Sequence, residues 1–192
     1  MHDKPTLRQD LRERLRALDP SFIAAASQQI AEKILHLATA WPKGTTIALF
    51  GGLKGEPDLL SHLLPALNAQ GVCACFFQIE STALMPRQIT SLEDLQRGSM
   101  NAWEPKPHCP RLDIAALDII LVPGLAFTRD GARLGRGGGY YDRLLANPTC
   151  HAQRIAIAFD IQIIDHIPVE DHDQRVRQII TESGLIQSAV SH

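Results

Sequence analysis

The sequence predicts an α/β protein with a helix–sheet–helix arrangement of three layers around a mainly parallel, mixed sheet. Short apolar runs typical of buried strands alternate with stretches whose apolar residues recur at helical spacing. The first elements follow in the order helix, helix, strand, helix, strand, which favours a right-handed crossover and a parallel core. The chain has 192 residues, an ordinary domain size, so we expect a single domain over residues 1–192.

Two helices are expected to open the chain. Leucines at helical spacing between residues 7 and 18 predict a first helix that ends near Asp19-Pro20. Ser21 can cap a second helix, which runs to about Ala40 and is broken by residues 41–44.

A strand–helix–strand unit is expected next. Residues 45–50 form an apolar run typical of a buried strand, and a glycine loop follows at residues 51–56. Pro57 suits the first turn of a helix that Gly71 ends, and residues 72–77 form the second strand.

Shorter elements are expected in the second half, where prolines at 105 and 107 disfavour helix before them. In chain order they are a strand ending at 85–87, a short helix at 91–96, an extended segment at 103–107, a strand at 117–122, a helix opening at 140–146, a strand at 154–159 and an edge strand at 178–181.

The composition favours a soluble globular protein. Hydrophobic residues make up 45% and charged residues 21%, and the net charge of −2 gives no general attraction for nucleic acid. No apolar run reaches the length of a membrane span, and the N-terminus has no apolar signal core, so we expect a cytoplasmic protein. Cys73 and Cys75 lack the spacing of a zinc ribbon, and reduced buried thiols are expected.

The residues best suited to chemistry lie at 129–145, R-D-G-A-R-L-G-R-G-G-G-Y-Y-D-R-L-L, after the strand at 117–122. Glycine lets backbone N–H groups approach a ligand closely, and arginine adds charge and forked donors. A strand, such a loop and a helix start together indicate a phosphate site. The string has no G-x-x-x-x-G-K-[ST], and Tyr140 replaces the third glycine of G-x-G-x-x-G, which excludes the two common nucleotide motifs. The alternative is a long turn with surface arginines.

Both glycine loops, 51–56 and 131–139, follow strands, and ligands of open α/β sheets bind beyond the carboxyl ends of strands. We therefore expect one cleft between the two loops. Asp142 either complements the helix dipole or holds Mg²⁺, and Tyr140 and Tyr141 are either core aromatics or ligand contacts.

The chain resembles the 5-formyltetrahydrofolate cyclo-ligase family. The resemblance begins with P-G-L-A-F at 123–127, Gly131 and R-L-G-R-G-G-G-Y-Y-D-R at 133–143. It covers nearly the whole chain through K-P-T-L-R at 4–8, the 50–58 segment, W-E-P at 103–105 and P-V-E-D-H-D at 168–173.

This resemblance implies a cyclo-ligase or CoA-transferase-like fold and an ATP-dependent ligase. The reaction would close 5-formyltetrahydrofolate to 5,10-methenyltetrahydrofolate and release ADP and phosphate, with Mg²⁺ as cofactor. In the implied mechanism the formyl oxygen attacks the γ-phosphate, and N10 of the folate then attacks the activated carbon. The implied partners are these small molecules, with no nucleic acid or membrane, and the protein is expected to be a monomer.

The resemblance also implies roles for individual residues, with Arg136 and Tyr140 catalytic and Asp142 a metal ligand. The ATP-binding residues would be Lys4, Arg8, Arg133, Leu134, Gly135, Arg136, Gly137, Gly138, Gly139, Tyr140 and Tyr141. The folate-binding residues would be Gly51, Glu56, Arg136, Gly137, Gly138, Gly139 and Tyr140. Many family members carry a second metal-binding Asp where this chain has Arg177, so Asp171, Asp173 or water would supply that ligand.

Three alternatives stay open at this point. A phosphosugar isomerase or acyl-CoA transferase would need Glu56 or Asp142 as base or nucleophile, and it would not consume ATP. A folate- or nucleotide-binding regulator would be favoured by Arg177. Nucleic-acid binding through the basic first helix is disfavoured, because the net charge is negative and no aromatic platform accompanies those arginines.

Overall fold

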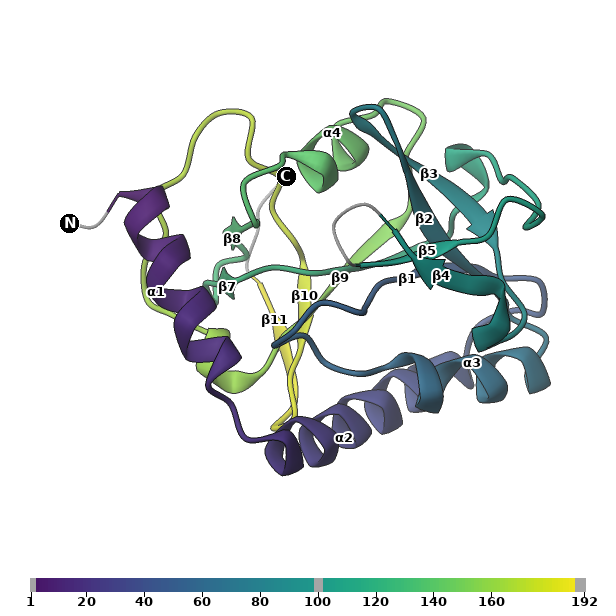
Figure 1. Cartoon of the computed structure of the whole chain (residues 1–192), viewed down its shortest axis with the longest axis horizontal. Coiled ribbons are helices and arrows are strands. Elements are labelled where there is room, and N and C mark those ends of the chain that lie inside the picture. Colours follow the sequence, from purple (N-terminus) through teal and green to yellow (C-terminus); the bar gives the residue numbers. More distant parts are fainter. Residues whose placement is uncertain (1–2, 99–101, 189–192) are drawn as a thin grey trace.

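A seven-stranded sheet forms the centre of the protein (Figure 1). The computed structural model describes residues 3–98 and 102–188. The strand order is β11-β10-β9-β6-β1-β2-β3. The strands are β1 (Thr46–Leu49), β2 (Cys73–Glu80), β3 (Ala83–Gln88), β6 (Ile119–Val122), β9 (Gln153–Ile157), β10 (Gln178–Ile180) and β11 (Leu185–Gln187). The five strands from β10 to β2 are parallel, and each edge strand is antiparallel to its neighbour, which confirms a mixed, mainly parallel sheet.

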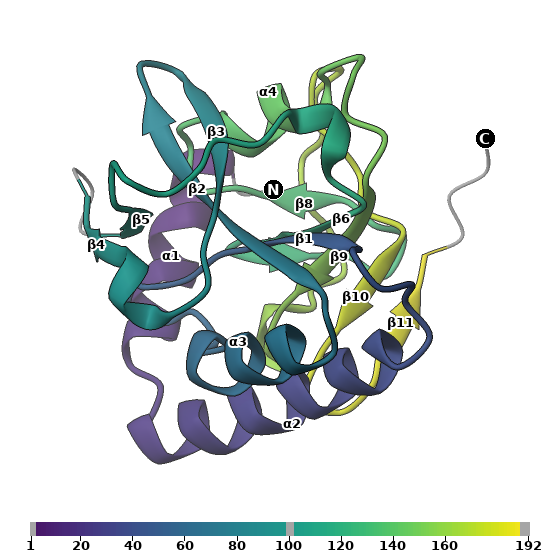
Figure 2. The ribbon, with the colours of Figure 1, turned by 90° about the vertical axis from the view of Figure 1, so that its right-hand side faces the viewer.

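Helices cover the two faces of the sheet unequally. The long helices α2 (Pro20–Ala38) and α3 (Leu60–Ala69) lie together on one face, and the short helix α4 (Tyr140–Leu145) lies on the other (Figures 1 and 2). Helix α1 (Lys4–Arg16) packs at one side of the sheet. The three layers expected from the sequence are therefore present, but loops complete the layer of α4.

Alternating side chains of the strands supply the cores on the two faces. In β1, Ile47 and Leu49 join the cluster under α2 and α3, whereas Ala48 joins the cluster that contains Leu144 of α4. Because side chains alternate along a strand, a central strand covered on both faces must be apolar throughout. This explains why the central strands are continuous apolar runs in the sequence.

Short elements complete the chain. They are the 3₁₀ turns η1 (Leu92–Asp94), η2 (Ile114–Ala116) and η3 (Asp160–Gln162), the two-stranded sheet of β4 (Leu95–Arg97) and β5 (Trp103–Pro105), and the two-stranded sheet of β7 (Ala126–Phe127) and β8 (Arg133–Leu134). The short helix expected at 91–96 is thus only a single 3₁₀ turn followed by a strand.

Several predicted boundaries were wrong. Asp19 rather than Ser21 caps α2, because the Asp19 carboxylate accepts from the Ser21 N–H at 2.7 Å. Helix α3 begins at Leu60 rather than at Pro57, and the Asp58 N–H donates to the Ser27 hydroxyl oxygen instead. Strand β10 is not at the edge, since β11, which was not anticipated, pairs along its outer side.

Gly131 lies in the turn between β7 and β8, where its backbone has a φ of +87°. Its carbonyl oxygen accepts from the Val176 N–H at 3.0 Å, and a Cβ at this position would overlap the Val176 carbonyl oxygen. The glycine therefore lets the turn pack against the backbone that leads into β10.

We expect Gly131→Ala to lower the free energy of unfolding by at least about 2 kcal/mol, because the variant adds left-handed strain to a backbone clash. Urea unfolding followed by circular dichroism measures the change. Gly184→Ala is the matched control, because a Cβ there meets no atom within 4 Å. A similar loss in both variants would contradict the explanation.

Candidate functional site

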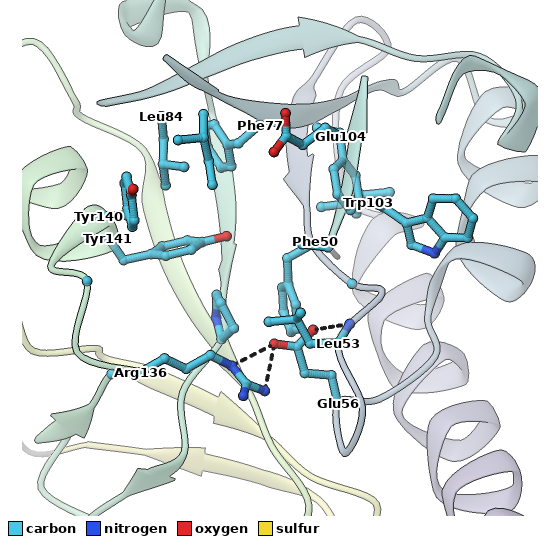
Figure 3. A pocket seen from close by; sticks show the side chains of 18 of the residues that line it. Phe50, Leu53, Glu56, Phe77, Leu84, Trp103, Glu104, Arg136, Tyr140 and Tyr141 are labelled. Atoms are coloured by element: carbon cyan, nitrogen blue, oxygen red, sulfur yellow. Dashed lines mark hydrogen bonds and ion pairs between the residues drawn. The ribbon is translucent and has the colours of Figure 1, made fainter. Parts of the chain in front are cut away.

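A pocket of about 360 Å³ opens at the carboxyl ends of β1 and β6 (Figure 3). Phe50 and Gly51 line it directly after β1, and Pro123 lines it directly after β6. Another wall is formed by residues 133, 135, 136 and 138–142, whereas Leu134 and Gly137, also expected at the site, do not line the pocket. The two glycine loops share one cleft, as the sequence predicted.

An ion pair joins the two loops across this pocket. Arg136 Nη2 and Nε lie 3.0 and 3.2 Å from Glu56 Oε1, and the Leu53 N–H donates to Glu56 Oε2 at 3.3 Å. Burial raises the pKa of the Glu56 carboxyl, although Arg136 and the Leu53 N–H partly offset the shift. Both carboxylate oxygens of Glu56 are therefore engaged.

Helix α1 holds the glycine-arginine loop by its carbonyl groups. Arg8 Nε donates to the Gly135 carbonyl oxygen at 3.0 Å, and Arg12 Nη2 donates to the Arg136 carbonyl oxygen at 2.5 Å. Among the described residues, none accepts a hydrogen bond from the N–H groups at 137–139. These donors are free for an anionic ligand.

Arg133 supports the loop from beneath rather than reaching out of it. Its guanidinium is 3% exposed and pairs with Asp142 Oδ1 at 2.5 Å. Arg133 Nη1 also donates to the Pro123 carbonyl oxygen at 3.3 Å, and its guanidinium carbon lies 5.9 Å from the centre of the Tyr141 ring. Arg133 thereby ties the end of β6 to the start of α4.

The remaining walls are largely aromatic and apolar (Figure 3). Tyr141 meets Phe77 edge to face with ring centres 6.0 Å apart, and burial raises the pKa of the Tyr141 hydroxyl, which stays protonated at neutral pH. Leu84 and Trp103 complete these walls. A flat, partly apolar ligand fits between such surfaces.

Asp142, the expected metal ligand, lines the pocket and keeps one carboxylate oxygen open. Its Oδ1 receives the Arg133 guanidinium and, at 3.4 Å, the Gln174 N–H, whereas no described residue donates to its Oδ2. A carboxylate with one open oxygen fits Mg²⁺, which takes one or two carboxylates and fills its shell with phosphate oxygens and water.

The residues expected to supply a second metal ligand are differently engaged. Asp173 Oδ2 pairs with Lys4 Nζ at 2.6 Å, and Glu170 Oε1 lies 2.9 Å from the same ammonium group. Arg177 precedes β10, and its carbonyl oxygen accepts from the Ser188 N–H. In the part of the chain that the structure describes, the only close group of three metal-binding side chains is Asp94, His108 and Cys109, which does not line the pocket.

Lys4, expected at the ATP phosphates, is buried at the start of α1 and does not line the pocket. Its two carboxylate partners fasten α1 to the 170–173 segment. Arg8 lies beside the loop that it binds. The structure thus brings Glu56, Arg136, Tyr140 and Asp142 to one pocket with the loop glycines, and the roles proposed for Lys4 and Arg8 stay predictions.

Two charged residues of the pocket, Arg12 and Glu104, were not predicted from the sequence. Arg12 follows Arg8 by four residues, a helical spacing that places both on one face and could have revealed it. Glu104 lies in the short strand β5, where the sequence pattern does not show which face meets a ligand.

Residues 1–182 match the family model described as the 5-formyltetrahydrofolate cyclo-ligase family. The chain belongs to this family. It is 32% identical over 194 residues to the 5-formyltetrahydrofolate cyclo-ligase of Mus musculus, and the match covers 94% of each protein. These findings confirm the resemblance seen in the sequence.

Solved structures of the cyclo-ligase type share the fold. A 5,10-methenyltetrahydrofolate synthetase from Mycoplasma pneumoniae superimposes with a TM-score of 0.78 at 25% identity, covering 94% of this chain and 99% of that one. The Aquifex aeolicus 5,10-methenyltetrahydrofolate synthetase gives a TM-score of 0.77 at 25% identity, covering 98% of this chain and 94% of that one.

Within residues 3–98 and 102–188, each helix is too short or too polar to cross a bilayer.

The Lys4–Asp173 pair should make stability depend on pH in a defined direction. Burial alone would raise the pKa of Asp173, but hydrogen bonds from Lys4 and the Glu170 N–H outweigh it and hold the pKa below its usual value. Burial alone would lower the pKa of Lys4, but Asp173 and Glu170 outweigh it and raise the pKa. The stabilisation is therefore lost as the pH falls through the lowered pKa of Asp173, or rises through the raised pKa of Lys4.

We expect Lys4→Met to lower the free energy of unfolding by about 1–3 kcal/mol at pH 7, because hydrogen bonds to charged groups are lost. The difference from the wild type should shrink at pH 3. Urea unfolding at the two pH values measures it, with Arg14→Met, which removes an exposed pair with Asp10, as the control. A difference that does not change with pH would sink this interpretation.

Proposed function

We propose that this protein is an ATP-dependent ligase that closes 5-formyltetrahydrofolate to 5,10-methenyltetrahydrofolate and releases ADP and phosphate. Family membership supports the reaction. The Glu56–Arg136 ion pair is the main support for assigning the reaction to this pocket. The pair joins the aromatic walls of the pocket to a loop whose N–H donors are free. A flat ring system and a polyphosphate would meet there.

The chemistry requires activation of a formamide, whose carbon is a poor electrophile. In the proposed mechanism the formyl oxygen attacks the γ-phosphorus of ATP, and ADP leaves. The N10 lone pair then attacks the activated carbon, N10 loses its proton, and phosphate departs with the former formyl oxygen as the ring closes. These reaction steps need alignment of the two substrates and neutralisation of phosphate charge rather than a protein nucleophile.

In our proposal, residues of the pocket and the glycine loop provide this alignment and charge neutralisation. Arg136 lies where the folate pocket meets the loop and would stabilise the charge of the phosphoryl group in transfer, with Tyr140 beside the same groups. Glu56 and Gly51 would line the folate side. The ATP side would take the glycine N–H groups, Arg8 and the rest of 133–141, with Lys4 assigned there by resemblance alone.

Asp142 would hold Mg²⁺, with substrate phosphate oxygens and water as further ligands. The metal, when bound, neutralises phosphate charge. Arg133 fixes the orientation of the Asp142 carboxylate through Oδ1, which leaves Oδ2 for the metal. This arrangement works with one protein carboxylate, so Arg177 at the position of a second is compatible with activity.

We further propose that residues 1–192 act as one cytoplasmic, monomeric domain. The central sheet takes strands from between Thr46 and Gln187, and the pocket is lined by residues from between Arg12 and Asp142, so both draw on most of the chain. Four free cysteines, at 73, 75, 109 and 150, fit a reducing compartment.

Purified protein mixed with 5-formyltetrahydrofolate, Mg²⁺ and ATP should generate the methenyl product, followed by its near-ultraviolet absorbance. We expect product formation only with ATP, in equal amounts with ADP. Product without ATP would point to another reaction class. Tight folate binding without product would point to a binding protein instead of an enzyme.

We expect Arg136→Ala to lower kcat/KM by about 10²–10³-fold, the usual cost of one charge-stabilising donor, while the protein stays folded. The variant leaves the Glu56 carboxyl without its cation, and protonation can relieve the buried charge. Steady-state kinetics with circular dichroism test this. Arg111→Ala, which removes an exposed guanidinium outside the pocket, is the control, and wild-type turnover of Arg136→Ala would refute the role.

A further inference from the structure

A third carboxylate, that of Glu104, lines the pocket and has no hydrogen-bond partner among the described residues. Glu104 belongs to β5 and is 9% exposed. Its Oε1 is fully covered and accepts no hydrogen bond, and no described residue donates to the carboxylate. Figure 3 shows the side chain directed into the pocket from the side opposite Glu56.

The local structure makes room for this carboxylate. β4 and β5 pair antiparallel with Gln96 opposite Glu104, and Gly98 follows β4. A Cβ on Gly98 would overlap Glu104 Oε1, although the backbone of Gly98 is not left-handed. Glycine at 98 thus leaves a space that the Glu104 side chain fills.

A buried carboxylate without donors is unfavourable, because it has lost water and gained nothing in return. Such groups are rare in folded proteins and call for an explanation in each case. Here the carboxylate faces a pocket, so donors from a ligand can satisfy it.

Two of the three acidic side chains of the pocket, Glu56 and Glu104, differ in what they can still accept. Glu56 already receives Arg136 at Oε1 and the Leu53 N–H at Oε2. Glu104 receives nothing from the described residues. Apolar side chains line the same part of the pocket, and Figure 3 shows Phe77 between Glu104 and Leu84. The region around Glu104 therefore suits a flat ring whose edge carries N–H donors.

We propose that Glu104 accepts hydrogen bonds from the 2-amino group and N3–H of the folate pterin ring. A rotation about the soft terminal torsion of Glu104 would turn both oxygens, the covered Oε1 included, toward these two adjacent and parallel donors. Glu56 then acts mainly through Arg136, which it holds at the meeting point of the two substrates. This inference rests on the proposed function and adds a residue that determines which ring the pocket accepts.

The test compares Glu104→Gln with the wild type in equilibrium binding of 5-formyltetrahydrofolate, measured by calorimetry without ATP. The amide keeps the size of the side chain but can accept at only one atom. We expect folate binding to weaken about tenfold or more, as for loss of a hydrogen bond to a charged group, with ATP binding unchanged. The melting temperature of the ligand-free protein should not fall, because no described residue makes a hydrogen bond to Glu104 that the substitution could remove.

A folate analogue with a methyl group in place of the 2-amino group isolates the contact. It should bind the wild type more weakly than 5-formyltetrahydrofolate does, and Glu104→Gln should weaken its binding little further. Glu93→Gln, at an exposed position on η1, is the control and should bind both ligands as the wild type does.

Several outcomes would overturn the proposal. Wild-type folate affinity in Glu104→Gln, an equal loss of folate and ATP binding, or an unfolded or less stable variant would each do so. If Glu104→Gln weakened binding of the methyl analogue as much as it weakens binding of 5-formyltetrahydrofolate, the contact with the 2-amino group would be excluded. If the wild type converts the folate with ATP while Glu104→Gln behaves normally, only this inference fails. If the wild type does not bind folate at all, the proposed function fails with it.

Discussion

The ion pair between Glu56 and Arg136 is the interaction on which the site depends. It connects the loop after β1 with the loop that precedes α4, two segments 80 residues apart. Because Glu56 is buried, its carboxylate is tolerated only with the Arg136 guanidinium and the Leu53 N–H beside it. Without this pair, the aromatic pocket and the glycine loop would be neighbouring features rather than one site.

The glycine loop owes its shape to groups outside it. Arg8 and Arg12 of α1 bind its carbonyl oxygens, and Arg133 lies beneath it with Asp142. Cationic side chains thereby engage the acceptors of the backbone, while the N–H donors at 137–139 are left for a ligand. The arginines are thus as much a framework for the loop as a source of positive charge.

The sequence was sufficient for the centre of the fold and for the presence of one cleft. β1 and β6 were predictable because burial on both faces demands continuous apolar runs, and the loops after them had to meet at one edge. Edge elements were harder: Leu185 and Gln187 of β11 are exposed, so no alternation marks the strand. Glu104 was missed because its place in the pocket is set by tertiary packing around a three-residue strand.

The fastening of α1 has a consequence for how the protein is made. Lys4 and Asp173 meet across 169 residues, and Arg8 reaches Gly135 across 127. Chain segments emerge from the ribosome in order, and contacts between distant segments form late because their closure is entropically costly. The first helix is therefore synthesised long before its binding partners exist. The nascent chain can fasten this helix only after the segment around Asp173 has been translated.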